Sequence, residues 1–295
     1  MRHRIRRTRY QLLLGLDLTL VAGASILIYF SVFAANEIQP TPDVRHALGQ
    51  ILFLSIMLIH LLAFNFSMPV FAAGAIAGER QDRTLELLGT SPLSARQIIW
   101  GKLGSTMMFA LLLLVTSLPF LGAVFLLGGV GLLELGISTA LLILAAAAWV
   151  AIGIWLSSVL PRLLPATVLA YAVSNGLLFG APGLFLILAA LSPQSLDAFM
   201  STLVAPSFTG SNVFLQVVLS MGTWLLAATS PITSAVLSRL LLLEHDALLW
   251  HTLALPGQGS LAVPSPWLIS VVLYGLAVWF FSRQAARRLD RGDKL

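Results

Sequence analysis

Long apolar runs constrain the fold of this chain more than any other feature of its sequence. They fall roughly at residues 18–35, 51–77, 99–127, 135–156, 166–191 and 265–282. A helix that crosses the hydrocarbon core of a bilayer needs about 20 apolar residues. The last run is the shortest, and its helix is expected to begin a few residues earlier. The runs therefore predict an all-α polytopic membrane protein with six transmembrane helices.

Composition excludes a large soluble domain. The chain is 58% hydrophobic and 10% charged, whereas soluble domains carry about 25% charged residues. It has no cysteine, which excludes disulfides, thiolate metal sites and cysteine nucleophiles. Its net charge of +5 is typical of membrane proteins with basic cytoplasmic loops. We therefore expect contact with membrane lipid and no nucleic-acid partner.

Basic residues predict the orientation of the spans. Fifteen of the 17 lysines and arginines lie in the four segments that six spans place on one side of the membrane. Only Arg45 and Arg239 are left for the other side. Because cytoplasmic segments carry the excess of basic residues, both termini are expected in the cytoplasm. The predicted location is a plasma membrane of the bacterial inner-membrane type.

The N-terminal segment has five arginines before its apolar run. The run is too long for the core of a signal peptide, about 7–15 residues, so it is expected to be a retained span. Because Asp17 would be costly at the bilayer centre, we place the start of the span at Leu18 and predict that Asp17 caps the helix. Residues 1–17 then form an interfacial arm, with an amphipathic helix over 4–16. The alternative is one continuous span in which Asp17 faces a partner helix.

The segment 192–264 is expected to be a helical outer segment. It holds an apolar run over 213–228, then Pro231, then an amphipathic stretch to Leu253. One further span here would place the basic tail outside, so the segment holds either no full span or two. We predict none, and leave open whether 213–250 forms re-entrant, interfacial or paired spanning helices. The whole chain, 1–295, is then one transmembrane domain: the arm, five spans over 18–191, the outer segment, the sixth span over 265–282 and a cytoplasmic tail over 283–295.

A compact charged segment, GERQDRTLELLGTSPLSARQIIWGK, separates the second and third apolar runs. The helix of the second run is expected to continue out of the membrane to Leu88. In such a helix Leu85 and Leu88 lie on one face, and Glu79, Asp82 and Glu86 lie on another. The segment therefore begins as an amphipathic helix.

The same segment contains a stop signal and a start signal. Gly89 suits a helix end, and Ser91 is biased away from helix because Pro92 follows it. Ser94 and Gln97 have the spacing of a capping box, which predicts a new helix from this point. The segment is thus expected to be a helix, a tight turn and a second helix.

This run closely resembles the cytoplasmic loop of ABC-2 type transporter permeases. That family commonly shows an acidic-basic start, then T-L-E-L-L, then T-S/T-P-L-S, then a Gly-Lys pair at the next span. The matching positions are Glu79, Arg80, Thr84, Leu85, Glu86, Leu87, Leu88, Thr90, Ser91, Pro92, Leu93, Ser94, Gly101 and Lys102. The family often has glycine before the threonine, where this chain has Arg83.

The resemblance implies a transmembrane permease subunit of an ATP-driven exporter. In the family two permease halves pair, so the partner is a second copy or a sister permease, and ATPase subunits or domains lie beneath them. The loop helix would dock in a groove of the ATPase and couple its closure to the spans. The residues implied in this coupling are Glu79, Arg83, Leu85, Glu86 and Leu88, with the turn formed by Gly89, Ser91, Pro92 and Ser94.

The chain lacks the phosphate-binding loop of an ATPase. That loop requires the pattern G-x-x-x-x-G-K-[ST]. The only Gly-Lys pair is at Gly101 and Lys102, with Arg96 where the first glycine is needed and Leu103 after the lysine. We therefore expect a non-catalytic subunit without a cofactor, and ATP bound by a partner subunit.

Polar residues within the runs are further candidates. His60 and Asn65 lie in the second run and Asn175 lies in the fifth. Ionisable and polar residues at this depth are functional candidates by default. The alternative is interhelical hydrogen bonding, worth about 0.6 kcal/mol for each bond.

Small residues and prolines predict where helices pack closely, bend or end. The glycines are Gly74, Gly78, Gly122, Gly128, Gly129 and Gly131, and the prolines are Pro119, Pro165 and Pro182.

Two other classes of protein are less well supported. An ion-driven secondary transporter usually has internal repeats and charged residues near the midplane, and a membrane-embedded enzyme needs convergent catalytic residues. Neither feature is evident in the sequence. Glu244, His245, Asp246 and His251 match no zinc spacing, so no metal site is expected. The sequence does not identify the cargo.

Overall fold

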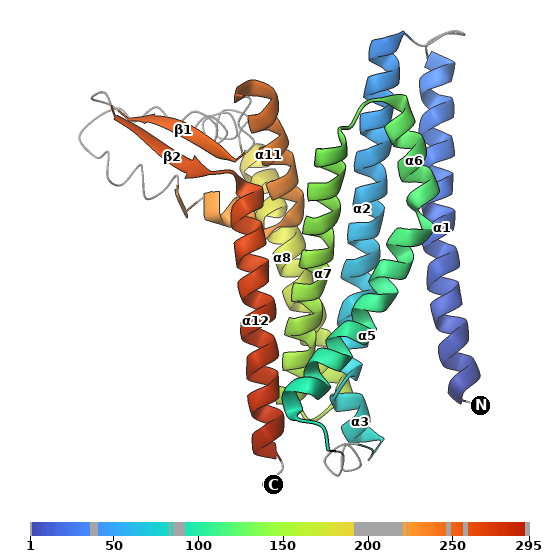
Figure 1. The fold of residues 1–295 in the computed structure, drawn as a ribbon, viewed down its shortest axis with the longest axis vertical. Coiled ribbons are helices and arrows are strands. Elements are labelled where there is room, and N and C mark those ends of the chain that lie inside the picture. Colours follow the sequence, from blue (N-terminus) through green and yellow to red (C-terminus); the bar gives the residue numbers. More distant parts are fainter. Residues whose placement is uncertain are drawn as a thin grey trace. The chain divides into compact units, whose positions relative to one another are not determined.

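The computed structural model describes residues 2–35, 41–82, 84, 92–191, 221–222, 224–245, 249–255 and 259–292. Within these residues, six helices are long and apolar enough to cross a membrane. They are α1 (Arg2–Ala35), α2 (Pro42–Gly74), α5 (Ala95–Thr116), α7 (Leu132–Val159), α8 (Leu163–Leu191) and α12 (Pro266–Gly292), drawn in Figure 1. Their number confirms the six predicted spans.

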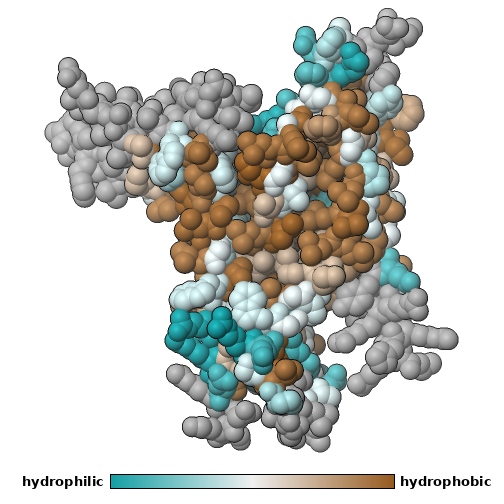
Figure 2. Space-filling view, viewed as in Figure 1, coloured by the Kyte–Doolittle hydropathy of each residue, from teal (hydrophilic) through white to brown (hydrophobic). Residues whose placement is uncertain are grey.

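The chain divides into two compact units. Unit 1 comprises Met1–Thr167 and Phe281–Leu295, and unit 2 comprises Val168–Phe280. On the face drawn in Figure 2, hydrophobic side chains cover the middle of the helices, and hydrophilic side chains gather toward their ends. This distribution fits an apolar band flanked by two aqueous interfaces. The single domain over 1–295 stays a prediction.

α2 is the central helix of unit 1. α1, α5, α6 (Leu118–Leu127) and α7 all pack against it. The α2–α7 contact is close because Gly153 lies against Ala72, where an added Cβ would be 2.5 Å from the alanine Cβ. Phe64 of α2 and Trp149 of α7 are among the large side chains buried in this unit.

α1 is one continuous helix of 34 residues. The prediction that Asp17 caps the first span, at the end of a separate interfacial arm, is therefore wrong. Asp17 lies inside the helix and is only 3% exposed. The stretch long enough to cross a membrane begins at Gln11 rather than at Leu18. The alternative, in which Asp17 faces a partner helix, is confirmed, because its carboxylate lies beside His60 of α2. A polar partner on a neighbouring helix removes the reason to keep this residue outside the bilayer.

The third apolar run forms two helices rather than one. α5 ends at Thr116, and α6 begins at Leu118 with Pro119 in its first turn. Proline cannot donate a backbone hydrogen bond and its ring clashes with the preceding turn, so Pro119 marks a helix boundary, as predicted. The Ser117 hydroxyl donates to the Leu114 carbonyl at 2.8 Å, which covers one of the carbonyls at the break.

The loop after α6 depends on glycine. Gly128 ends α6 with a φ of 79°, a left-handed conformation that costs other residues energy. At Gly129 an added Cβ would collide with the carbonyl oxygen of His46 in α2. The predicted close packing is therefore confirmed at these two positions. At Gly122 and Gly131 an added Cβ would meet nothing within 4 Å, so no described part of the chain packs closely against these two glycines.

The part of unit 2 that precedes α12 is not wholly helical. α11 (Pro231–His245) is followed by an antiparallel pair of strands, β1 (Trp250–Leu255) and β2 (Gly259–Pro264), in which Trp250 lies opposite Pro264. The predicted all-α fold holds for the six long helices, but the predicted amphipathic helix to Leu253 is wrong here, where the chain forms a hairpin. Short alternating segments around a Pro-Gly pair are typical of a hairpin, and the leucine-rich stretch before them obscured that pattern.

Unit 2 contains a helix break before Pro231. The carbonyl oxygens of residues 227–229 lie at this break, and hydroxyl groups donate to each of them. Thr233 donates to the first at 2.5 Å, Ser270 to the second at 2.7 Å and Tyr274 to the third at 2.8 Å. Interrupted backbone at membrane depth requires this kind of cover by protein.

The glycine loop yields a matched test of packing. Gly129→Ala should destabilise unit 1 by about 1–3 kcal/mol, since the new methyl group must displace the α2 backbone. Gly122→Ala should be neutral or slightly stabilising, because its site is open and alanine favours helix. The measurement is the thermal midpoint of each purified variant in detergent. Equal midpoints for the two variants would contradict the close approach of this loop to α2.

Candidate functional site

A helix break lies where the charged segment begins. α2 ends at Gly74, residues 75–76 form a turn, and α3 spans Ala77–Gln81. The prediction that one helix continues from the second span to Leu88 is therefore wrong at this turn. Figure 1 places α3 near the start of α5 and the end of α7, at one end of unit 1.

Ser157 of α7 accounts for the break. Its hydroxyl donates to the Ala73 carbonyl at 2.6 Å and accepts from the backbone amides of Ile76 at 3.1 Å and Ala77 at 2.8 Å. One donor and two acceptor sites are the full capacity of a hydroxyl group. Ser157 is wholly buried, so water does not replace it. The Ser157 hydroxyl thus replaces the backbone hydrogen bonds that α2 and α3 lose at the turn.

The close packing predicted at Gly74 and Gly78 is not found among the residues that the structure describes. An added Cβ at Gly74 or at Gly78 would meet nothing within 4 Å. The two glycines therefore flank the break without mediating a close helix contact. No local signal in the sequence identifies Ser157, which lies about 80 residues further along.

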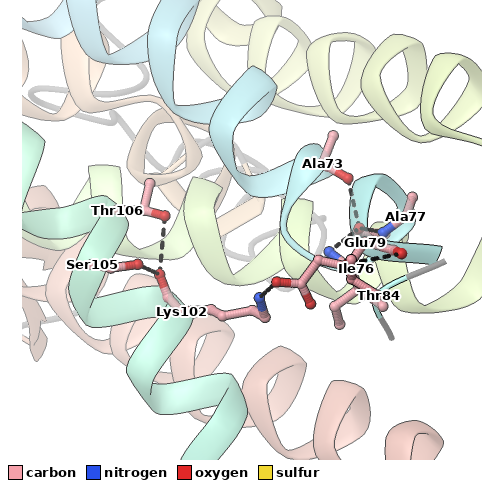
Figure 3. Close-up of polar contacts among 9 residues, drawn as sticks. Ala73, Ile76, Ala77, Glu79, Thr84, Lys102, Ser105 and Thr106 are labelled. Carbon is pink, nitrogen blue, oxygen red and sulfur yellow. Dashed lines mark hydrogen bonds and ion pairs between the residues drawn. The ribbon is translucent and has the colours of Figure 1, made fainter. Parts of the chain in front are cut away.

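An ion pair fastens α3 to α5. Lys102 Nζ lies 2.5 Å from Glu79 Oε1, and the two side chains are 19% and 29% exposed. Figure 3 shows Lys102 extending from its helix toward Glu79. Sequence analysis included Glu79 among the coupling residues but did not predict this partner. The signal that it missed is the opposite charge of two residues at the membrane ends of neighbouring helices.

A third contact fastens α3 to the end of α7. The Arg80 guanidinium donates to the carbonyl oxygen of Leu160 at 3.2 Å, and Leu160 is the C-cap residue of α7. A cation at a helix C-terminus also interacts favourably with the helix dipole. We call α3, with its contacts to Ser157, Leu160 and Lys102, the α3 junction. It links three membrane helices, α2, α5 and α7, at a single point.

The second half of the charged segment confirms the predicted helix start. Ser94 Oγ accepts from the Gln97 amide at 3.3 Å, and the Ser94 amide donates to Gln97 Oε1 at 2.9 Å. This is a complete capping box at the start of α5. Pro92 lies in a bend before it. The other predicted site residues of the segment, which lie outside the described residues, are Arg83, Leu85, Glu86, Leu88, Gly89 and Ser91.

The predicted polar candidates in the spans have different surroundings. His60 and Asn65 are both fully buried in α2. Asn175 is half-buried in α8, and its amide donates to the Tyr171 carbonyl of the same helix at 2.9 Å. His60 lies 3.6 Å from Asp17, a contact that sequence reasoning missed because it placed Asp17 outside the bilayer. Among the side chains that the structure describes, no three His, Asp or Glu residues form a metal site.

Comparison with known proteins identifies a family. A family model described as ABC-2 family transporter protein matches residues 1–285. The match covers α1 through most of α12, and so includes the α3 junction. No curated protein sequence matches the chain.

The Ser157 contacts generate a prediction with a neighbouring control. Ser157→Ala leaves two amides and one carbonyl without their partner, and each buried unsatisfied group costs about 1–3 kcal/mol. Ser158→Ala removes only a bond to the Trp155 carbonyl in the same helix. Hydrogen exchange of residues 75–82 should accelerate at least about tenfold in the first variant and should be unchanged in the second. Equal exchange in both variants would show that Ser157 does not hold the break.

Proposed function

The chain belongs to the ABC-2 transporter family, and on this premise we propose that it is the permease subunit of an ATP-driven exporter. The family match over residues 1–285 makes it a membrane component of an ABC-2 transporter. Its six long apolar helices make it a multi-pass membrane protein. Export, the translocation pathway and the mode of coupling are our proposal.

The α3 junction is the observation that carries the proposed coupling. Ser157, Glu79 and Arg80 connect α3 to α7 and α5 by direct bonds, and only a two-residue turn separates it from α2. A push on the charged segment would therefore act on three membrane helices together. A segment attached only by flexible ends would absorb the same displacement.

The proposed partners follow from the family and from the charged segment. An ABC-2 family membrane component works with an ATPase, and residues 1–295 contain no phosphate-binding loop of the Walker type. We propose that Leu85 and Leu88 anchor the segment in a groove of the ATPase and that Glu86 makes a charged contact there. We further propose that Gly89, Ser91, Pro92 and Ser94 shape the turn, and that a second copy or a sister permease completes the pathway.

The anchors can be tested by substitution. Changing Leu85 and Leu88 together to Ser should weaken association with the cognate ATPase at least about thirty-fold, because a buried anchor is worth about 2 kcal/mol or more. Transport should fall with the association. Glu86→Lys should have a smaller effect, since charges at a solvated rim are largely screened. The measurement is co-purification of the ATPase with each variant in detergent.

A matched control separates docking from folding. Leu132 and Leu133 are two exposed leucines at the start of α7, and their double change to Ser should leave ATPase capture intact. Size-exclusion profiles should be unchanged for both double variants. If the variant at Leu85 and Leu88 still captured the ATPase and transported normally, the segment would be a capped turn with no coupling role.

The proposed orientation generates a separate prediction. The proposal places both termini, Arg83 and Arg162 in the cytoplasm, and Arg45 and Arg239 outside, because 15 of the 17 basic residues fall on one side. The chain has no cysteine, so a single cysteine at each position reports only itself. A membrane-impermeant thiol reagent added to intact cells should label the cysteines at Arg45 and Arg239 alone. A cysteine in the C-terminal tail that reacted from outside would overturn the proposed topology.

A further inference from the structure

Two ionisable side chains meet inside the membrane helices of unit 1. Asp17 lies in the apolar stretch of α1 and His60 lies in that of α2. Their side chains are 3% and 0% exposed, and Nε2 of the imidazole lies 3.6 Å from Oδ2 of the carboxylate. A buried group of either kind is costly in a bilayer unless a partner compensates it. Neither residue takes part in the α3 junction.

The surroundings of His60 fix where its hydrogens lie. Nδ1 is 2.8 Å from the carbonyl oxygen of Ile56, one turn earlier in α2. Nε2 is 3.3 Å from the carbonyl oxygen of Leu113 in α5. A carbonyl oxygen only accepts hydrogen bonds, so Nδ1 must carry a hydrogen. In a neutral ring Nε2 would then present a lone pair to two oxygen atoms, those of Leu113 and Asp17.

The carboxylate lacks compensation of its own. Neither oxygen of Asp17 has a hydrogen-bond partner among the described residues. One additional proton resolves both conflicts. On Nε2 it makes an imidazolium that donates toward Leu113 and Asp17, and on Asp17 it makes a carboxylic acid that donates toward Nε2. In either position the pair has no net charge.

We propose that Asp17, His60 and the Leu113 carbonyl form a binding site for one proton, and that this proton fastens α1 to α2 and α5. The site does not depend on the function proposed above. Its ligand is the proton itself, taken up from or released to water when α1 moves.

No other charged group competes for this proton in the central stretches of the helices that surround it. The stretches 11–32 of α1, 47–74 of α2 and 103–116 of α5 contain no Asp, Glu, His, Lys or Arg besides this pair. α6 contains none, and the acidic residue of α7, Glu134, lies in its first turn. Tyr29 of α1 is three turns away and 41% exposed. The charge on the Asp17–His60 pair is therefore what changes with pH at the contact between α1 and α2.

α1 is attached weakly enough for one proton to matter. Within residues 11–32, only Asp17 and Val21 are buried. They lie one turn apart, on the same face of α1. Loss of the proton leaves an uncompensated carboxylate in this small contact, and breaking a buried charge pair in this way is strongly destabilising. α1 then lowers its free energy by moving Asp17 out of the contact and toward water, so the contact closes at low pH and opens as the pH rises.

The reactivity of a buried cysteine reports this opening. Val21→Cys places a thiol in the contact, and Leu27→Cys places one on the exposed side of α1, where the native side chain is 71% exposed. The probe is a membrane-permeant maleimide, with each variant in lipid nanodiscs. The measured quantity is the alkylation rate of Val21→Cys divided by that of Leu27→Cys. This ratio cancels the ordinary rise of thiol reactivity with pH. It should increase on the order of tenfold between about pH 5 and about pH 9, as an open state that is minor at low pH becomes populated.

Asp17→Asn is the matched variant. Its amide can donate to Nε2 of a neutral imidazole without an added proton, so the ratio of rates should stay low and independent of pH. A ratio that is flat in the native background, or that rises equally in the Asp17→Asn background, would overturn the proton-dependent contact.

A second measurement does not depend on either cysteine variant. Nitrogen-15 spectra of histidine-labelled protein, with the His60 signals assigned by their loss in His60→Gln, should show a protonated Nδ1 at every pH. They should also show a second proton, on Nε2 or shared with Asp17, that is lost as the pH rises. A neutral His60 that carries its only proton on Nε2 throughout would overturn the site.

Discussion

Three helix breaks in the part of the chain that the structure describes, at residues 75–76, 117 and 230, are each covered by a hydroxyl group, because lipid offers no water to replace a lost backbone hydrogen bond. Ser157 covers the turn between α2 and α3 with three bonds. Ser117 covers a carbonyl between α5 and α6. In unit 2, Ser270 and Tyr274 cover carbonyls at the break before Pro231. Serine, threonine and tyrosine suit this task because one oxygen both donates and accepts.

The break at the α3 junction has consequences beyond local stability. A straight extension of α2 would project beyond the membrane with only one attachment to it. The turn at residues 75–76 instead brings α3 to the end of α7 and the start of α5, where Arg80 and Glu79 find partners. Under the proposed function, a force from an ATPase would reach three helices through these contacts.

Two ion pairs among the described residues of unit 1 differ in the cost of removing their charges from water. The Glu79–Lys102 pair is partly exposed, so water screens it and desolvation is small. The Asp17–His60 pair is almost wholly buried, where removal of either partner leaves a charge that neither water nor protein compensates. The first pair therefore suits a permanent link, and the second is sensitive to a single proton.

Much of the architecture could be predicted from sequence because its determinants are local. Each span needs only enough apolar residues in a row, and all six long helices were predicted on this basis. The capping box of Ser94 and Gln97 depends on two residues three apart, and the helix boundary at Pro119 depends on a single ring. The charged motif pointed to the family that the comparison identifies.

The remaining features were decided by tertiary contacts between residues far apart in the chain. The end of α2 at Gly74 requires a hydroxyl from α7, so local helix signals predicted a continuation that does not occur. Asp17 stays inside α1 because His60 stands opposite it on α2, and hydropathy alone treats such a carboxylate as a reason to end the span. The hairpin of β1 and β2 consists of leucine-containing segments that also fit a helix, and only their pairing selects strands. Sequence determines which segments enter the membrane, since burial in lipid depends on composition, whereas the partners of polar groups depend on which helices become neighbours.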